Sequence, residues 1–148
     1  MFLQSGIAIP TIVTGVPTAS NIFVNGESVE FQAYNIGGNN FFRLRDIAYV
    51  LNGTSAQFSV GWNAAANAIT LTTGQPYAPI GGELGGQAVG NVAATPADVR
   101  IFLDGRQIAP AAFNIGGSNY FMLRVLAAEL GFNVGWDAGA NAIMITTS

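Results

Sequence analysis

The chain of 148 residues contains no cysteine, no histidine and no lysine. Without cysteine there is neither a disulfide framework nor a thiolate ligand, and without histidine most transition-metal sites cannot be built. The same absences remove the usual pairs of nucleophile and base on which covalent catalysis depends. The sequence therefore predicts a protein that is not an enzyme, with no catalytic residue, no cofactor and no metal site.

Charge is also scarce, since only 9% of the residues are charged and the formal net charge is −3. An average soluble domain has about 25% charged residues. Nucleic-acid binding needs clustered Lys and Arg to neutralise phosphates, so this class of partner is excluded. A surface of amides and small residues is weakly protected against association with copies of itself. We therefore expect a homo-oligomer or polymer.

Long hydrophobic runs are missing, although 50% of the residues are hydrophobic, because Gly and Pro interrupt every apolar stretch. The sequence accordingly predicts no membrane span. Residues 1–20 lack a positive n-region and are broken by Pro10, Gly15 and Pro17. They are not typical of a signal peptide.

The chain does contain an internal repeat. Three motifs occur twice in the same order: IFVNG at 22–26 and IFLDG at 101–105, NIGGNNFFRLR at 35–45 and NIGGSNYFMLR at 114–124, FSVGW at 58–62 and FNVGW at 132–136. Self-similarity of this kind marks a duplicated folding unit.

Turn and helix signals recur in both copies. Asn-Gly at 25–26 and Asp-Gly at 104–105 predict two-residue hairpins, as does Gly-Gly at 37–38. Apolar residues at i, i+3, i+4 and i+7, counted from Leu44 and from Leu123, predict one helix in each copy. We expect an α+β fold of two similar small lobes, each of short antiparallel β-strands packed around one α-helix.

Four segments follow from this plan: an N-terminal extended arm at 1–20, a first repeat at 21–73, a linker rich in Gly, Pro and Ala at 74–99, and a second repeat at 100–148. A unit of about 50 residues buries only about 60% of the surface that its unfolded chain exposes. Each lobe is therefore expected to depend on contacts with the other lobe for its stability.

Strict alternation of apolar and small residues predicts which aromatic side chains are buried. It assigns six residues to the core: Phe58, Val60, Trp62, Phe132, Val134 and Trp136. Tryptophans with exposed faces would instead be platforms on which sugar rings stack. The pattern favours the core for both tryptophans. Exposed aromatics, or aromatics that line a lobe interface, are expected elsewhere: Tyr34, Phe41, Tyr49 and Tyr77.

Arg45 and Arg124 recur near the start of the two expected helices, where the helix dipole gives a cation no stabilisation. A structural ion pair is the favoured explanation, with Asp137 as the partner of Arg124. The first copy has Asn63 in the place of Asp137, so Asp46 is the alternative neighbour of Arg45. An arginine that binds a polymer carboxylate is the less favoured interpretation.

The motifs resemble the copper amine oxidase N-terminal-like, or stalk, domain family. The resemblance lies in VNG at 24–26, YNIGGNNFFRLRDIA at 34–48, FSVGW at 58–62 and their second copies. It implies two tandem copies of small antiparallel sheets wrapped on a helix, which act as accessory modules of exported Gram-positive bacterial proteins. It does not imply the oxidase activity, because the copper in those enzymes is held by histidines, which this chain lacks.

These observations lead to two functional hypotheses. The first is a non-catalytic extracellular or cell-surface structural module that self-associates into a filament or surface assembly. Its N-terminal arm would add as a strand to a neighbouring subunit, or fold back on its own lobe. The residues expected in this contact are Phe2, Leu3, Ile7, Ile9, Ile12 and Val13. The alternative is an accessory module of a larger exported protein that binds cell-wall glycan or another polysaccharide.

Overall fold

The two repeats fold into matching series of strands and one helix each. The computed structural model describes residues 12–86 and 88–147. The first series is β1 (Val13–Pro17), β2 (Asn21–Val24), β3 (Glu27–Ser28), β4 (Tyr34–Ile36), β5 (Asn39–Arg43), α1 (Leu44–Leu51), β6 (Phe58–Asn63) and β7 (Ala68–Thr73). The second is β8 (Val92–Pro96), β9 (Ile101–Leu103), β10 (Arg106–Ile108), β11 (Ala112–Ile115), β12 (Ser118–Met122), α2 (Leu123–Leu130), β13 (Asn133–Asp137) and β14 (Ala142–Thr146).

The predicted turns are confirmed by their backbone angles. Asn25 and Gly26 have φ values of 50° and 88°, and Asp104 and Gly105 have values of 51° and 84°. Both central residues of such a hairpin turn must adopt positive φ, which Asn, Asp and Gly tolerate best. Gly131 ends α2 in the left-handed conformation, as expected for a residue just beyond a helix.

A closed barrel forms the centre of the arrangement, with strand order β1-β4-β5-β12-β11-β8. Equivalent strands of the two repeats meet at both junctions, β5 with β12 and β1 with β8, and both pairs are antiparallel. Phe42 lies directly opposite its own counterpart, Phe121. This register relates the repeats by a two-fold rotation.

The barrel changes the predicted segment boundaries. β1 pairs with β4 and with β8, so residues 13–17 belong to the barrel rather than to a free arm. Within the expected arm contact, Val13 pairs with Ala94, Ile12 is 66% exposed, and the remaining residues, Phe2, Leu3, Ile7 and Ile9, lie outside the described residues.

Two further sheets join the repeats to each other, with strand orders β10-β9-β7-β6 and β13-β14-β2-β3. The first hairpin of each repeat extends the last hairpin of the other through a parallel pair, with Ile101 beside Ile69 and Ile22 beside Ile143. Separate lobes, each around its own helix, are therefore not formed by the described residues. Every sheet named here combines strands of both repeats.

The hairpin turns at 25–26 and 104–105 stabilise this exchange, by which we mean the pairing of each repeat's first hairpin with the last hairpin of the other repeat. The Asp104 carboxylate accepts hydrogen bonds from the Thr73 amide at 2.9 Å and the Thr73 hydroxyl at 2.7 Å. Its counterpart Asn25 binds Thr147 through both ends of its amide: the Oδ1 atom accepts from the Thr147 backbone amide at 2.9 Å, and the Nδ2 group donates to the Thr147 hydroxyl at 3.0 Å. Each turn thus fastens the end of the other repeat's last strand.

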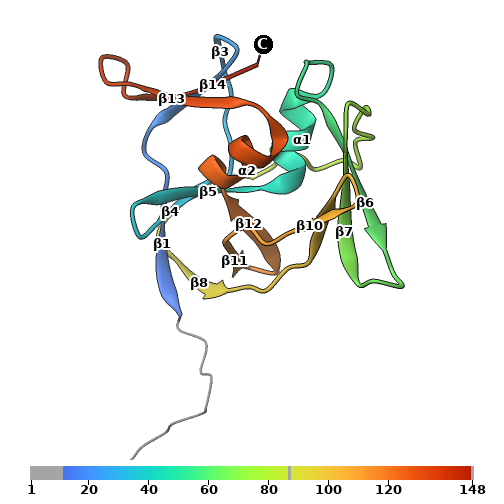
Figure 1. Cartoon of the computed structure of the whole chain (residues 1–148). Helices are drawn as coiled ribbons and strands as arrows, with labels where there is room; N and C mark the ends of the chain where they lie inside the picture. The colour runs from blue at the N-terminus through green and yellow to red at the C-terminus, as the bar shows by residue number, and fades with distance from the viewer. Residues whose placement is uncertain (1–11, 87, 148) are drawn as a thin grey trace, which may run out of the picture.

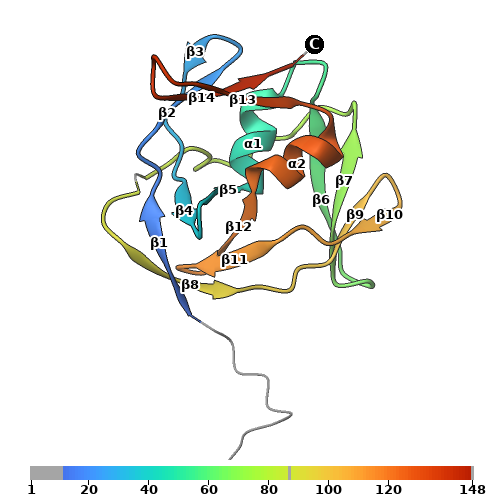
Figure 2. The same cartoon turned by 60° about the vertical axis from the view of Figure 1, so that its left-hand side comes forward.

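The two helices of the described residues lie in the middle of the molecule, between the barrel and the two sheets (Figures 1 and 2). Residues of both helices share one hydrophobic core with Phe42 and Phe121. None of the described helices is long and apolar enough to cross a membrane.

Aromatic rings fill the inside of the barrel. Tyr34 meets Tyr120 edge to face with centroids 5.5 Å apart, and Phe41 meets Phe113 in the same way at 5.1 Å. Edge-to-face pairs are favoured because the positive ring edge approaches the negative face. Tyr34 and Phe41 are 3% and 2% exposed, so the first alternative for them, an exposed aromatic, is wrong. They line the contact between the repeats, which corresponds to the second alternative.

Part of the predicted linker lies on α1, and we call residues 77–85 the strap. Tyr77 is buried and exchanges two hydrogen bonds with the Asn52 side chain, at 3.0 and 3.1 Å. The Leu84 amide donates to the Asp46 carboxylate at 2.9 Å. The remainder of the linker includes β8, which belongs to the barrel.

Candidate functional site

Both tryptophans are exposed, which overturns their predicted place in the core. Along β6 the exposed fraction rises from 0% at Phe58 to 60% at Trp62, and Trp136 at the end of β13 is 54% exposed. Phe132 is buried, while Val60 and Val134 are partly buried against the core. Phe58 and Phe132, at the inner ends, belong to the core that both helices share, whereas the tryptophans lie beyond it. The alternation predicted correctly which face of the strand each side chain occupies, but not how deeply each side chain is buried.

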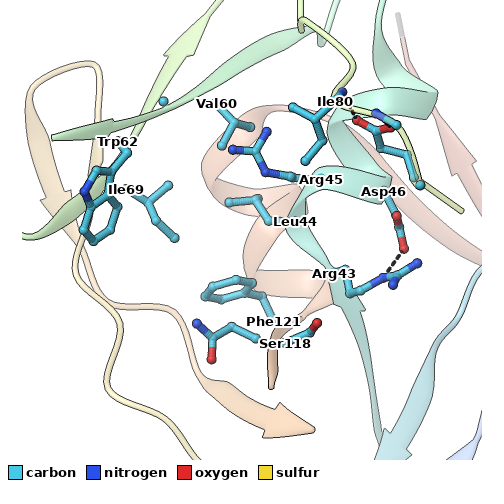
Figure 3. Close-up of a pocket in the computed structure, with 15 residues that line it drawn as sticks. Arg43, Leu44, Arg45, Asp46, Val60, Trp62, Ile69, Ile80, Ser118 and Phe121 are labelled. Carbon is cyan, nitrogen blue, oxygen red and sulfur yellow. Dashed lines mark hydrogen bonds and ion pairs between the residues drawn. The ribbon is translucent and has the colours of Figure 1, made fainter. Parts of the chain in front are cut away.

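Trp62 borders a pocket of about 360 Å³, which we call the first pocket. Its walls come from the start of α1, the strands β6 and β7, the strap and the β11–β12 hairpin of the other repeat. Figure 3 shows Trp62 beside Ile69 at one side, Arg45 between Val60 and Ile80, and Phe121 and Ser118 below. This volume lies within the range of about 300 to 1,000 Å³ that is usual for small-molecule sites.

A second pocket of about 190 Å³ contains Trp136. Its lining residues occupy the repeat positions of the first pocket: Asn40 for Asn119, Leu123 for Leu44, Arg124 for Arg45, Val134 for Val60, Gly135 for Gly61, Trp136 for Trp62 and Ile143 for Ile69. Each pocket takes its asparagine from one repeat and its tryptophan and arginine from the other. The duplication therefore produces two copies of one site, which neither repeat could complete alone.

Arg45 is positioned by the strap rather than by a carboxylate. Its Nη1 donates to the Tyr77 hydroxyl at 3.2 Å, and its guanidinium carbon lies 5.8 Å from the centre of the Tyr77 ring. The Tyr77 hydroxyl donates in turn to the carboxylate of Glu83. That hydrogen bond, followed by the one from the Ile80 amide, lowers the pKa of Glu83 to about 2. Burial is the main reason why the pKa of Tyr77 is raised.

An ion pair that the sequence analysis missed forms one side of the first pocket. The Arg43 Nε donates to the Asp46 carboxylate at 2.7 Å, and Asp46 is 2% exposed (Figure 3). Arg43 also donates to the Gly85 carbonyl at 3.1 Å. The spacing of three residues at a helix start is the signal that could have found this pair. Its function here is to tie the strap to α1.

The predicted partners of the recurring arginines are wrong. Asp46 pairs with Arg43 and not with Arg45. Asp137 accepts hydrogen bonds from the backbone amides of its own turn, at Gly139 and Ala140. Arg124 is exposed, and within residues 12–86 and 88–147 it forms no ion pair of 4.0 Å or less.

The two sites combine an indole face, a guanidinium group, a side-chain amide and apolar walls. Such a set can stack on a ring and hydrogen-bond to its substituents. The described part of the chain contains no group of three or more His, Cys, Asp or Glu side chains that could hold a metal ion.

The family model of the copper amine oxidase N-terminal domain matches residues 23–146 as one stretch. That domain is distinct from the catalytic domain of those oxidases. The match spans both repeats, and two tandem copies of the family domain are not shown. No curated protein and no solved structure matches the chain significantly. The chain therefore belongs to the copper amine oxidase N-terminal domain family.

Proposed function

We propose that this protein is a non-catalytic extracellular module that binds a glycan, with cell-wall polysaccharide as the first candidate ligand. The observation that carries the proposal is the exposure of Trp62 and Trp136, at 60% and 54%, in two equivalent pockets. Burying an aromatic side chain stabilises a fold by roughly 1.5 to 3 kcal/mol, so leaving both rings in water gives up stability. A bound sugar ring would cover the indole face in each pocket.

The asparagines add polar groups suited to sugar hydroxyls. The Oδ1 atom of Asn119 accepts a hydrogen bond from Asn114 at 3.1 Å, and that of Asn40 accepts one from Asn35 at 3.2 Å. These bonds orient each amide and leave its Nδ2 group, which can donate two hydrogen bonds, to a ligand. The Oδ1 atom of Asn40 also accepts a hydrogen bond from the Thr18 hydroxyl at 3.0 Å, so the two pockets share the Asn–Asn bond and differ in this additional one.

The position of the pockets also favours a polymer over a small free ligand. Both are partly open, and each has its tryptophan at the outer end of a strand. The resemblance described above implies an exported protein, which would place wall polymers within reach. The module would hold a polysaccharide chain without changing it.

Co-sedimentation with insoluble peptidoglycan and with other insoluble polysaccharides tests this proposal. We expect the chain to sediment with at least one of them, and the double variant Trp62→Ala, Trp136→Ala to stay in the supernatant. Tyr49→Ala is the matched control, because Tyr49 is 43% exposed and lies outside both pockets. Retention of the double variant, or loss of binding in the control alone, would contradict the proposal.

A second candidate function, self-association, is favoured by the exposed apolar entry to β1. Ile12 and Val16 are 66% and 45% exposed, and the sequence has no charged residue before Glu27. Because residues 13–17 belong to the barrel, the informative deletion removes residues 1–11 and leaves β1 intact. Light scattering should show an assembly for the full chain and a monomer for this deletion. A monomeric full chain at high concentration would contradict self-association.

A further inference from the structure

The two pockets share their plan but differ in charge. The first pocket is lined by Arg43, Arg45, Asp46 and Glu83, whose formal charges cancel. In the second pocket, Arg124 is the one charged residue among the described residues of the lining. The second repeat has Met122 and Val125 where the first has Arg43 and Asp46. The duplication has thus left one neutral pocket and one cationic pocket.

The two recurring arginines also differ in their surroundings. Arg45 already donates to the Tyr77 hydroxyl and lies near that ring. Arg124 is exposed, and the described residues offer its guanidinium no ion pair. A free guanidinium presents a planar set of donors that matches the two oxygens of a carboxylate.

On the basis of the proposed glycan binding, we infer that the second pocket selects a sugar unit that carries a carboxylate, with Trp136 stacking on the ring and Arg124 binding the acid. The first pocket takes a neutral unit. The second pocket, at about 190 Å³, is smaller than the usual range of about 300 to 1,000 Å³ and would therefore hold no more than a single unit of a polymer. The formal net charge of the chain is −3, which repels acidic polymers at long range. A preference for the acid must therefore come from a local contact.

Isothermal titration with tetragalacturonate and with its methyl ester tests this inference, because the two ligands share their rings and differ in charge. The full chain should bind the acid at least about tenfold more tightly than the ester, the ratio expected for one charge-assisted contact. Arg124→Gln should remove this preference, and the matched variant Arg45→Gln should keep it. Added salt should weaken binding of the acid only.

The possible results separate this inference from the function on which it rests. Equal affinity for the acid and the ester, with both reduced by Trp136→Ala, would overturn the charge selectivity and leave glycan binding in place. An acid preference that survives Arg124→Gln, or that disappears with Arg45→Gln, would also overturn it. Absence of binding by either ligand would overturn the inference and count against the glycan proposal as well.

Discussion

Trp62 and Phe58 show how one alternating strand serves both the fold and the surface. Both side chains point to the same face of β6, yet their exposed fractions are 60% and 0%. Phe58 lies in the shared core, whereas Trp62 borders the first pocket. Residue type and alternation therefore predict orientation. How deeply each side chain is buried depends on how far the shared core extends along the strand.

This difference predicts opposite effects of truncation on stability. Trp62→Ala should change the free energy of unfolding by less than about 1 kcal/mol, as surface substitutions do. Phe58→Ala should cost about 3 to 5 kcal/mol, because it removes a buried ring and leaves a cavity. Denaturant unfolding measures both changes. A large loss for Trp62→Ala would place the indole in the core and remove it from the site.

Gly61 and Gly135 offer a matched comparison at the floor of the two pockets. A Cβ atom at Gly61 would lie 2.8 Å from the Thr70 hydroxyl, whereas one at Gly135 would meet nothing within 4 Å. Gly61→Ala should therefore cost about 1 kcal/mol or more from overpacking. Gly135→Ala should stay within about 0.5 kcal/mol. Equal costs in thermal unfolding would show that this close approach is absent.

At the scale of the element, the strap makes the two pockets unequal. Residues 80–83 of the strap line the first pocket, and none of the second pocket's lining comes from the strap. The strap is held by Asn52 at Tyr77 and by Asp46 at Leu84. It is the part of the predicted linker that shapes the site.

The low pKa of Glu83 predicts how the strap responds to acid. Its pKa is lowered from 4.5 to about 2, so the stabilisation it supplies is present above 4.5 and is lost as the pH falls toward 2. Tyr77→Phe removes the hydroxyl and should raise the pKa of Glu83, which a titration followed by NMR measures directly. The loss of thermal stability caused by Tyr77→Phe should become smaller as the pH falls from 4.5 toward 2. An unchanged pKa in this variant would contradict the hydrogen bond.

Local patterns predicted the elements well, because hairpins and helix ends depend on nearby residues. The Asn-Gly and Asp-Gly turns and the spacings from Leu44 and from Leu123 all have a local physical cause. The strap and β8 lack such signals, since their partners are far away in the chain. Tyr77 is buried in the core that includes residues of α1, and Asn52, 25 residues earlier in the chain, holds its backbone.

At the scale of the whole molecule, the repeats complete each other. β9 and β10 extend the sheet of β6 and β7, while β2 and β3 extend that of β13 and β14. Repetition in the sequence could not distinguish this exchange from two separate lobes, because both arrangements use the same turns and helix faces. The paired pockets depend on another contact between the repeats, that of β5 with β12, and the sequence repeat gives no local signal for it.

The exchange predicts that neither repeat is stable alone. Residues 1–86 and residues 87–148, prepared as separate chains, should each be largely unfolded as monomers, since each lacks the partner strands of its sheets. Mixing them should restore the secondary structure seen by circular dichroism. Cooperative unfolding of either fragment as a monomer would contradict an interlocked fold.

Glycan binding in both pockets can be measured directly through the two tryptophans. The chain has 2 tryptophans, Trp62 and Trp136, so its nitrogen-proton NMR spectrum contains one indole signal from each pocket. Soluble fragments of the polysaccharide with which the chain sediments should shift both signals to saturation. Binding of those fragments with both indole signals unmoved would contradict the claim.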